Sequence, residues 1–187
     1  MDDGGPENRR GRLLVASPAL EDPNFHRAVV LMLEHSAEGA LGLVLNDPTP
    51  LLARDALPGA LAEAMPEDER IHRGGPVQPE AVIVLAEFDD PERAAAIAFG
   101  DVGVVDPDAE TEGLDGDVRA VRAFGGYAGW SGGQLESEIA QEAWIDAEPE
   151  AGDVFTTEAE GLWSRVLDRK GGPWRILARM PEDPTTN

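Results

Sequence analysis

The apolar positions of this chain gather in short runs that are separated by turn-forming residues. Residues 12–16 (RLLVA) predict a short strand, and residues 28–33 (AVVLML) form a continuous apolar run typical of a strand buried on both faces. Residues 41–45 (LGLVL) predict the partner strand of a hairpin, since the segment SAEGA that connects the two runs favours a turn. Asn46-Asp47-Pro48 then ends this strand, because proline cannot continue a central strand.

Further along the chain the apolar pattern is weaker. Residues 50–65 are rich in Leu and Ala, but Pro58-Gly59 breaks or kinks any helix there. Four more strands are predicted, at residues 70–77, which run into a glycine turn, and at residues 81–86, 101–105 and 118–124. The segment at 118–124 fits the end of a helix equally well.

Two helices carry clearer signals at their first residues. Ser131 precedes Gln134 by three positions, which is the spacing of a capping box, and an apolar pattern of helical period follows. Thr157 and Glu160 repeat this spacing ahead of a second amphipathic stretch, which ends at Gly171-Gly172-Pro173. Because strands and helices do not alternate regularly, we expect a mixed α+β fold rather than a doubly wound sheet.

Length and composition indicate one globular unit. The chain has 187 residues, of which 42% are hydrophobic, enough for one substantial core. We expect a single α+β domain over residues 11–180, with disordered tails at residues 1–10 and 181–187. No apolar run approaches the length of a membrane span, and the first residues do not resemble a secretory signal. We therefore expect a cytoplasmic protein with no membrane partner.

Charge and cysteine content exclude several functions. The 37 acidic residues outnumber the 15 basic ones and give a formal net charge of −22. Nucleic-acid binding draws most of its affinity from Lys and Arg, so nucleic acid is a disfavoured partner. The absence of cysteine excludes disulfides, cysteine-ligated zinc and thiol chemistry. The three histidines lie at positions 26, 35 and 72 without helical pairing, and we predict no metal and no cofactor.

The segment from Gly125 to Trp144 (GGYAGWSGGQLESEIAQEAW) is the most unusual part of the chain. It combines five glycines with the only tyrosine and two of the four tryptophans. Glycine is used where the backbone bends or approaches another group closely, and large aromatic side chains beside such bends indicate a rigid, shaped surface. The other tryptophans, Trp163 and Trp174, and Trp144 itself are expected to anchor a core or an interface.

Four collinear segments of this chain resemble the AlgH/YqgE family of bacterial proteins. They are residues 11–35, GALGLVLNDP at 39–48, HRGGPV at 72–77 and residues 124–144. The resemblance implies an α+β fold with a bifurcated, pseudo-barrel-like sheet surrounded by helices. It also implies that Asn46, Gly74-Gly75-Pro76 and Gly129-Trp130 gather near one another. The family carries the label of a transcriptional regulator, although this sequence contains no evident helix-turn-helix.

Residues 129–133 (GWSGG) match the G-x-S-x-G motif of serine hydrolases, with Ser131 as the nucleophile. Such a nucleophile needs a histidine base, which in hydrolases of this type follows the serine in the chain. All three histidines of this chain precede Ser131, and Ser131 is already explained as a helix cap. A hydrolase is therefore the alternative hypothesis.

The preferred hypothesis is a non-enzymatic regulatory protein that binds a small molecule or a protein partner. Backbone amides of the two glycine segments, an arginine and aromatic side chains suit a small planar or anionic ligand or the end of a peptide. A DNA-binding regulator is a third hypothesis that the net charge disfavours. The candidate ligand-binding residues are Asn46, Arg73, Gly74, Gly75, Tyr127, Gly129, Trp130 and Ser131.

Overall fold

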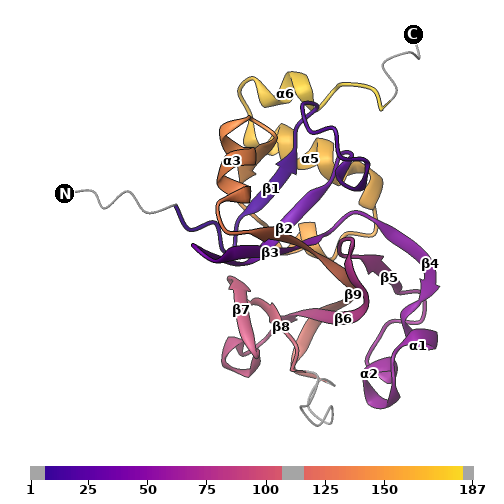
Figure 1. The fold of residues 1–187 in the computed structure, drawn as a ribbon. Coiled ribbons are helices and arrows are strands. Elements are labelled where there is room, and N and C mark those ends of the chain that lie inside the picture. Colours follow the sequence, from indigo (N-terminus) through magenta and orange to yellow (C-terminus); the bar gives the residue numbers. More distant parts are fainter. Residues whose placement is uncertain (1–6, 107–115, 183–187) are drawn as a thin grey trace.

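Ten strands form one open, mostly antiparallel sheet in this computed structural model, which describes residues 7–106 and 116–182 (Figure 1). The strand order is β10-β1-β2-β3-β9-β6-β8-β7, with β4 paired to β5 beside it. The strands are β1 (Leu13–Ala16), β2 (Val29–Ser36), β3 (Gly39–Val44), β4 (Pro48–Leu52), β5 (Arg70–Arg73), β6 (Val77–Phe88), β7 (Ala96–Phe99), β8 (Val102–Val104), β9 (Val118–Ser131) and β10 (Trp144–Ala147). The mixed α+β fold expected from the sequence is confirmed, and the sheet does not close into a barrel.

Short helices pack around this sheet. α1 and α2 lie beside β4 at one end of the molecule, while α5 and α6 lie together at the other end (Figure 1). The α-helices are α1 (Ala53–Ala56), α2 (Gly59–Glu63), α3 (Gln134–Ala140), α4 (Ala151–Val154), α5 (Leu162–Lys170) and α6 (Trp174–Leu177), and the 3₁₀ turns are η1 (Pro23–Phe25), η2 (Pro91–Arg93) and η4 (Ala159–Gly161).

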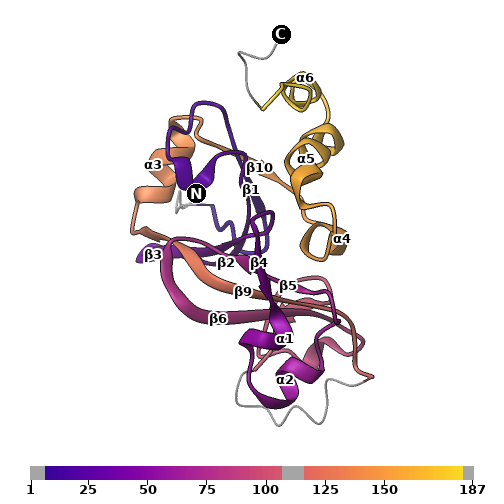
Figure 2. The same ribbon diagram turned by 90° about the vertical axis from the view of Figure 1, so that its right-hand side faces the viewer.

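Strands β1 and β2 are buried on both faces, as the continuous apolar run predicts. Figure 2 shows β1 and β10 between α3 on one side and α5 on the other. Leu13 and Val15 of β1 pack into the core on the α5 face, whereas Leu14 and Ala16 pack into the cluster on the α3 face. Alternate side chains of a strand point to opposite faces, so an uninterrupted apolar sequence is needed here.

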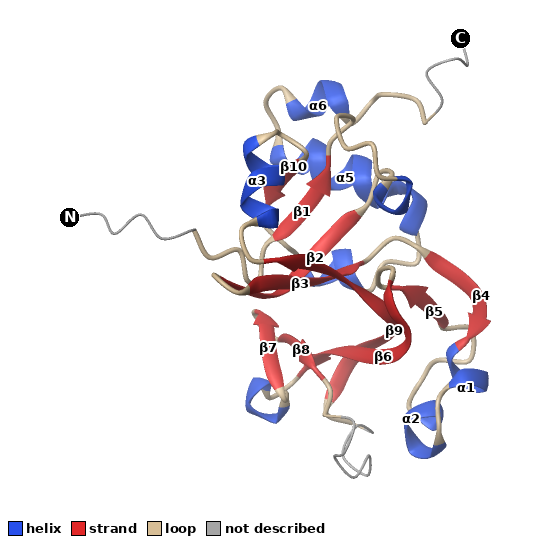
Figure 3. Ribbon diagram, viewed as in Figure 1, coloured by secondary structure: helices blue, strands red, loops and turns tan. Residues whose placement is uncertain are grey.

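Strand β9 joins the two halves of the sheet. Its C-terminal end pairs with β3, and the rest of the strand pairs with β6 (Figure 3). β5 adds a parallel pairing at Phe124 and Gly125, near the point where the sheet divides. The bifurcated sheet that the family resemblance implies therefore results from one long strand that serves two sets of partners.

Several sequence predictions of element boundaries were wrong. Ser131 does not cap α3: it ends β9 in register with Gly39, and Gly133, with a φ of +79°, is the N-cap residue. Thr157 does not begin α5, because the 3₁₀ turn η4 precedes that helix, as often happens at helix ends. The ambiguous segment at 118–124 is a strand. The sequence analysis missed the short strands β4, β7 and β10.

Part of the predicted N-terminal tail lies against the sheet. The N–H of Arg9 donates to Nδ1 of His35 (3.0 Å), and the guanidinium of Arg10 donates to the carbonyl of Ile97 (2.9 Å). Residues 7–10 thus contact both β2 and β7. Of the predicted tails, residues 1–6 and 183–187 lie outside the described residues.

Candidate functional site

Residues Gly74 and Gly75 cross strand β9 in direct contact. The N–H of Gly74 donates to the carbonyl of Gly125 (2.9 Å), and the carbonyl of Gly74 accepts from the N–H of Val44 (2.8 Å). A Cβ atom on Gly75 would lie 2.1 Å from the carbonyl carbon of Tyr127, so a larger residue does not fit. The structure brings these two glycine-rich segments together, and the Gly74 N–H holds strands to one another.

Asn46 holds the backbone that leads into β2. Its side-chain oxygen accepts from the N–H of Val29 (2.9 Å), and its side-chain nitrogen donates to the carbonyl of Arg27 (2.9 Å). Arg27 has a φ of +52°, a left-handed conformation that is uncommon outside glycine. Asn46 therefore stabilises a strained turn and fixes the direction in which Arg27 leaves the backbone.

Three other predicted residues lie on or near the surface. The guanidinium of Arg73 is exposed and lies 3.3 Å from the carboxylate of Asp47, so this cation already has an anionic partner. Tyr127 is half-buried against the main core. Gly129 is exposed and pairs with Leu41 across β3 and β9.

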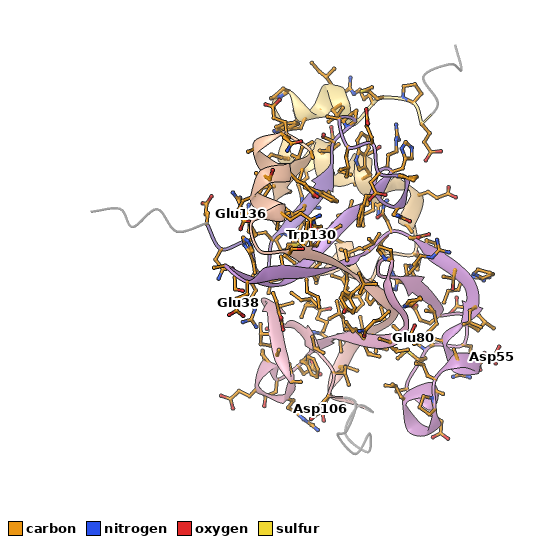
Figure 4. All side chains as sticks on the ribbon, in the orientation of Figure 1. Glu38, Asp55, Glu80, Asp106, Trp130 and Glu136 are labelled. Carbon is orange, nitrogen blue, oxygen red and sulfur yellow. The ribbon has the colours of Figure 1, made fainter. Side chains whose placement is uncertain are left out.

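The indole of Trp130 is buried at the end of β9, near α3 (Figure 4). Its ring stacks on Phe25 with centroids 6.2 Å apart and meets Trp144 edge-on at 5.9 Å. The indole nitrogens of Trp130 and Trp144 donate to the same oxygen of Glu138, at 2.9 and 2.8 Å. The aromatic cluster and this carboxylate fix α3 against the sheet.

The predicted site residues therefore divide between the two faces of the sheet. Tyr127 packs into the core on the α5 face, and a Cβ atom on Gly74 would contact Leu43 of the same core at 2.9 Å. Trp130 belongs to the cluster on the α3 face, and Ser131 is exposed at the end of β9. The contact of Gly74 and Gly75 with β9 and the Trp130 indole are close along β9, but they lie on opposite faces of the sheet.

His35 uses both ring nitrogens within the fold. Nδ1 accepts the N–H of Arg9, so the proton is on Nε2, which donates to Glu136 (2.7 Å). His35 thus connects the N-terminal segment to α3. The pKa of Glu136 is lowered, first by a hydrogen bond from the Glu136 backbone N–H and then by the hydrogen bond from His35. His35 therefore has no nitrogen free to take a proton from Ser131.

His72 is buried, with 3% of its surface exposed. Its Nδ1–H donates to the carbonyl of Arg70 (3.1 Å). Burial and then the positive charge of Arg122 lower the pKa of His72, so the ring stays neutral near neutral pH. Within the part of the chain that the structure describes, no three His, Asp or Glu side chains are grouped as a metal site requires.

A cavity of about 210 Å³ lies between the loop before β2 and residues 180–182. Its walls are mainly apolar and carry one arginine, one histidine and one glutamate. It is lined by residues 16–18, Leu20, His26, Arg27, Trp163 and residues 180–182. We call this space the Arg27 cavity.

Arg27 and Trp163 are fixed at this cavity. The guanidinium carbon of Arg27 lies 4.4 Å from the centroid of the Trp163 ring, within the range of a cation–π contact. The guanidinium also donates to the carbonyl of Met180, and the indole N–H of Trp163 donates to the carbonyl of Ala16 (2.8 Å). A cation, an aromatic ring and an apolar space thus meet in one place.

The sequence analysis missed this cavity for a physical reason. Arg27 and Trp163 are more than a hundred positions apart, and neither belongs to a local motif that indicates a site. The sequence analysis named Asn46 as a candidate ligand-binding residue, and in the structure its side chain is hydrogen-bonded to the backbone of Val29 and Arg27. The arginine that follows Asn24-Phe25-His26 carried no signal that distinguished it from other surface arginines.

Comparison with known proteins places this fold in a family. The model of the AlgH-like family matches residues 13–175. The chain belongs to the AlgH-like family. A UPF0301 protein of Streptomyces coelicolor is 45% identical over 183 residues, which cover 95% of this chain and 94% of the relative. A UPF0301 protein of Thermobifida fusca is 40% identical over 188 residues, with coverage of 95% and 94%.

Solved structures of AlgH-like proteins share the architecture. A crystal structure of a Corynebacterium diphtheriae protein superposes with a TM-score of 0.85 at 25% identity and covers 94% of both chains. The solution structure of the AlgH protein from Pseudomonas aeruginosa gives a TM-score of 0.70 at 27% identity, covering 97% of this chain and 98% of the other. No helix of the described residues is long and apolar enough to cross a membrane.

Proposed function

We propose that this AlgH-like protein is a non-enzymatic binding protein whose small-molecule ligand occupies the Arg27 cavity. The observation that carries the proposal is the guanidinium of Arg27, which is fixed over the Trp163 indole at the wall of an apolar space. Ligand sites are typically apolar hollows with a few placed polar groups, and this cavity has that composition. A regulatory role based on ligand binding needs no catalytic residue.

The surroundings of the candidate catalytic groups support binding rather than hydrolysis. Both nitrogens of His35 are hydrogen-bonded, one to the Arg9 N–H and one to Glu136. Glu138 accepts two indole N–H groups and a side-chain amide of Gln134. A general base must be within reach of the proton that it removes, and these groups already serve the fold.

The size of the cavity sets the size of the ligand. A cavity of about 150 Å³ lined by apolar side chains holds benzene, so about 210 Å³ has room for one ring with a small substituent. The walls from Leu20 and Met180 offer apolar contact, Arg27 offers charge and hydrogen-bond donors, and His26 offers a ring that can form a hydrogen bond. The ligand is therefore a compact molecule with an apolar body.

A fragment screen tests this proposal. Ring-sized fragments are added to the purified full chain, and thermal unfolding is followed together with the integrity of each fragment by mass spectrometry. We expect several fragments to raise the unfolding temperature without being consumed, because a ligand that binds only the folded state stabilises it. Consumption of a fragment by the protein contradicts the non-enzymatic proposal.

Two tryptophan variants locate the site. Leu20→Trp adds volume at the cavity wall and is expected to abolish the stabilisation by fragments. Leu51→Trp is the matched control, since Leu51 is 50% exposed on β4 and does not line the cavity. Equal stabilisation of both variants by the fragments contradicts binding in the Arg27 cavity.

A further inference from the structure

Arg27 differs from most arginines of this acidic protein. The majority of the arginines in the described residues lie within 4.0 Å of a carboxylate oxygen. The most buried of them, Arg122, is paired with Glu69 at 2.6 Å. Between residues 7 and 182, apart from the gap at 107–115, no carboxylate is paired with Arg27. A guanidinium that is partly removed from water without an anion is an incomplete ion pair.

The guanidinium of Arg27 is held ready for an anion. The backbone of Arg27 is fixed by Asn46, its guanidinium lies over the Trp163 ring, and one N–H is bound to the carbonyl of Met180. Arginine presents several N–H donors in a planar fork that matches the two oxygens of a carboxylate. A side chain fixed in this way loses little conformational entropy when it binds, which raises affinity.

We infer that the Arg27 cavity binds a small aromatic monocarboxylate of about the size of benzoate. The carboxylate of the ligand pairs with the Arg27 guanidinium, and its ring lies among the apolar walls formed by Pro18, Leu20 and Met180. This inference rests on the proposed function and names the ligand class of the same site. The Trp163 indole beneath the guanidinium keeps water from one side of the ion pair.

The charge of the protein favours a monoanion over a phosphate. The formal net charge of −22 repels anions in proportion to their charge, so a dianion meets about twice the repulsion of a carboxylate. Glu182 also lines the cavity and adds a local negative charge. For a ligand with one negative charge and a large apolar surface, contact with the apolar walls offsets the electrostatic repulsion.

The test uses three probes on the full-length protein. Fluorine NMR measures the dissociation constants of 4-fluorobenzoate and of its neutral counterpart 4-fluorobenzamide, and inorganic phosphate is added as a competitor. We expect the wild type to bind the benzoate about tenfold more tightly than the benzamide, the effect of one charge-assisted hydrogen bond. Benzamide binding as tightly as benzoate overturns the inference, as does equally effective displacement by phosphate.

Variants assign the preference to Arg27. Arg27→Gln is expected to remove the preference for the benzoate. Arg70→Gln is expected to keep it, because Arg70 also donates to a backbone carbonyl and has no carboxylate partner within the described residues, yet it does not line the cavity. A preference that survives Arg27→Gln, or is lost in Arg70→Gln, overturns the assignment. The wild-type comparison of the two probes decides the inference even where a variant fails to fold.

The two hypotheses fail in different ways. If other fragments stabilise the wild type but not Leu20→Trp, and 4-fluorobenzoate does not bind, the ligand class is wrong and the proposed function stands. Where no fragment of any charge binds, the proposed function and the inference both fall.

Discussion

Replacing Asn46 by alanine tests whether this side chain holds the turn that positions Arg27. The variant removes the hydrogen bonds to the Val29 N–H and to the Arg27 carbonyl, both 2.9 Å long. Leaving a buried backbone group without its partner costs about 1–3 kcal/mol, and Asn46 is only partly buried, so the lower end applies to each. We expect Asn46→Ala to lower the free energy of unfolding by about 2 kcal/mol.

Denaturant unfolding at equilibrium measures this loss, and thermal unfolding gives a second value. For a chain of this length, about 2 kcal/mol corresponds to a decrease of roughly 4–8 °C in the unfolding temperature. Asn24→Ala is the matched control, because the Asn24 side chain is exposed and has no hydrogen-bond partner among the described residues, and we expect a change within about 0.5 kcal/mol. A loss below about 0.5 kcal/mol for Asn46→Ala refutes the structural role assigned to Asn46.

Three further predictions concern other parts of the fold. The pKa of His72 is lowered in the folded state, so the unfolded chain takes up this proton first and stability decreases as the pH falls below about 6.5, by up to about 1.4 kcal/mol per pH unit. His72→Asn keeps an N–H donor but cannot titrate, so pH-dependent denaturant unfolding is expected to show a smaller decrease, and an unchanged slope contradicts this. Glu138→Ala leaves two indole N–H groups without their acceptor and is expected to lower the free energy of unfolding by about 2–4 kcal/mol. The near-ultraviolet circular dichroism signal is expected to decrease, and an unaltered spectrum contradicts the packing of the two indoles. Gly75→Ala places a methyl group 2.1 Å from the backbone of β9 and is expected to lower the free energy of unfolding, measured by thermal unfolding, by about 3 kcal/mol. In the control Gly152→Ala in α4, the methyl group meets no atom within 4 Å, and the change is expected to be neutral or stabilising. Equal effects of the two substitutions contradict the close contact of Gly75 with β9.

Local sequence patterns predicted most of the strands of this protein. The run at residues 28–33 is apolar without interruption because β2 packs against helices on both faces, and this is visible in the sequence alone. Gly74 and Gly75 form a local signal of the same kind, because a Cβ atom on Gly75 would lie 2.1 Å from the backbone of Tyr127. Each of these patterns depends on the surroundings of a single segment, so the local sequence is enough to predict it.

Features that depend on distant partners were not predictable. The strand at Trp144–Ala147 follows a helix without a turn signal, and its side chains are buried by α3 and α5 together. Ser131 has the spacing of a helix cap, but pairing with β3 keeps it in the strand. The pair of Arg27 and Trp163 depends on a turn held by Asn46, and no local rule relates these three positions.

The most direct test of the account is the response of the tryptophan indole resonances to 4-fluorobenzoate. In ¹⁵N-labelled protein each indole N–H gives its own signal, and single Trp→Phe variants assign them. We predict a saturable shift of the Trp163 signal, with the Trp130 and Trp144 signals unmoved, because only Trp163 of these three lines the Arg27 cavity. A shift of Trp130 in place of Trp163, or no shift at any indole, contradicts the assignment of this cavity as the ligand site.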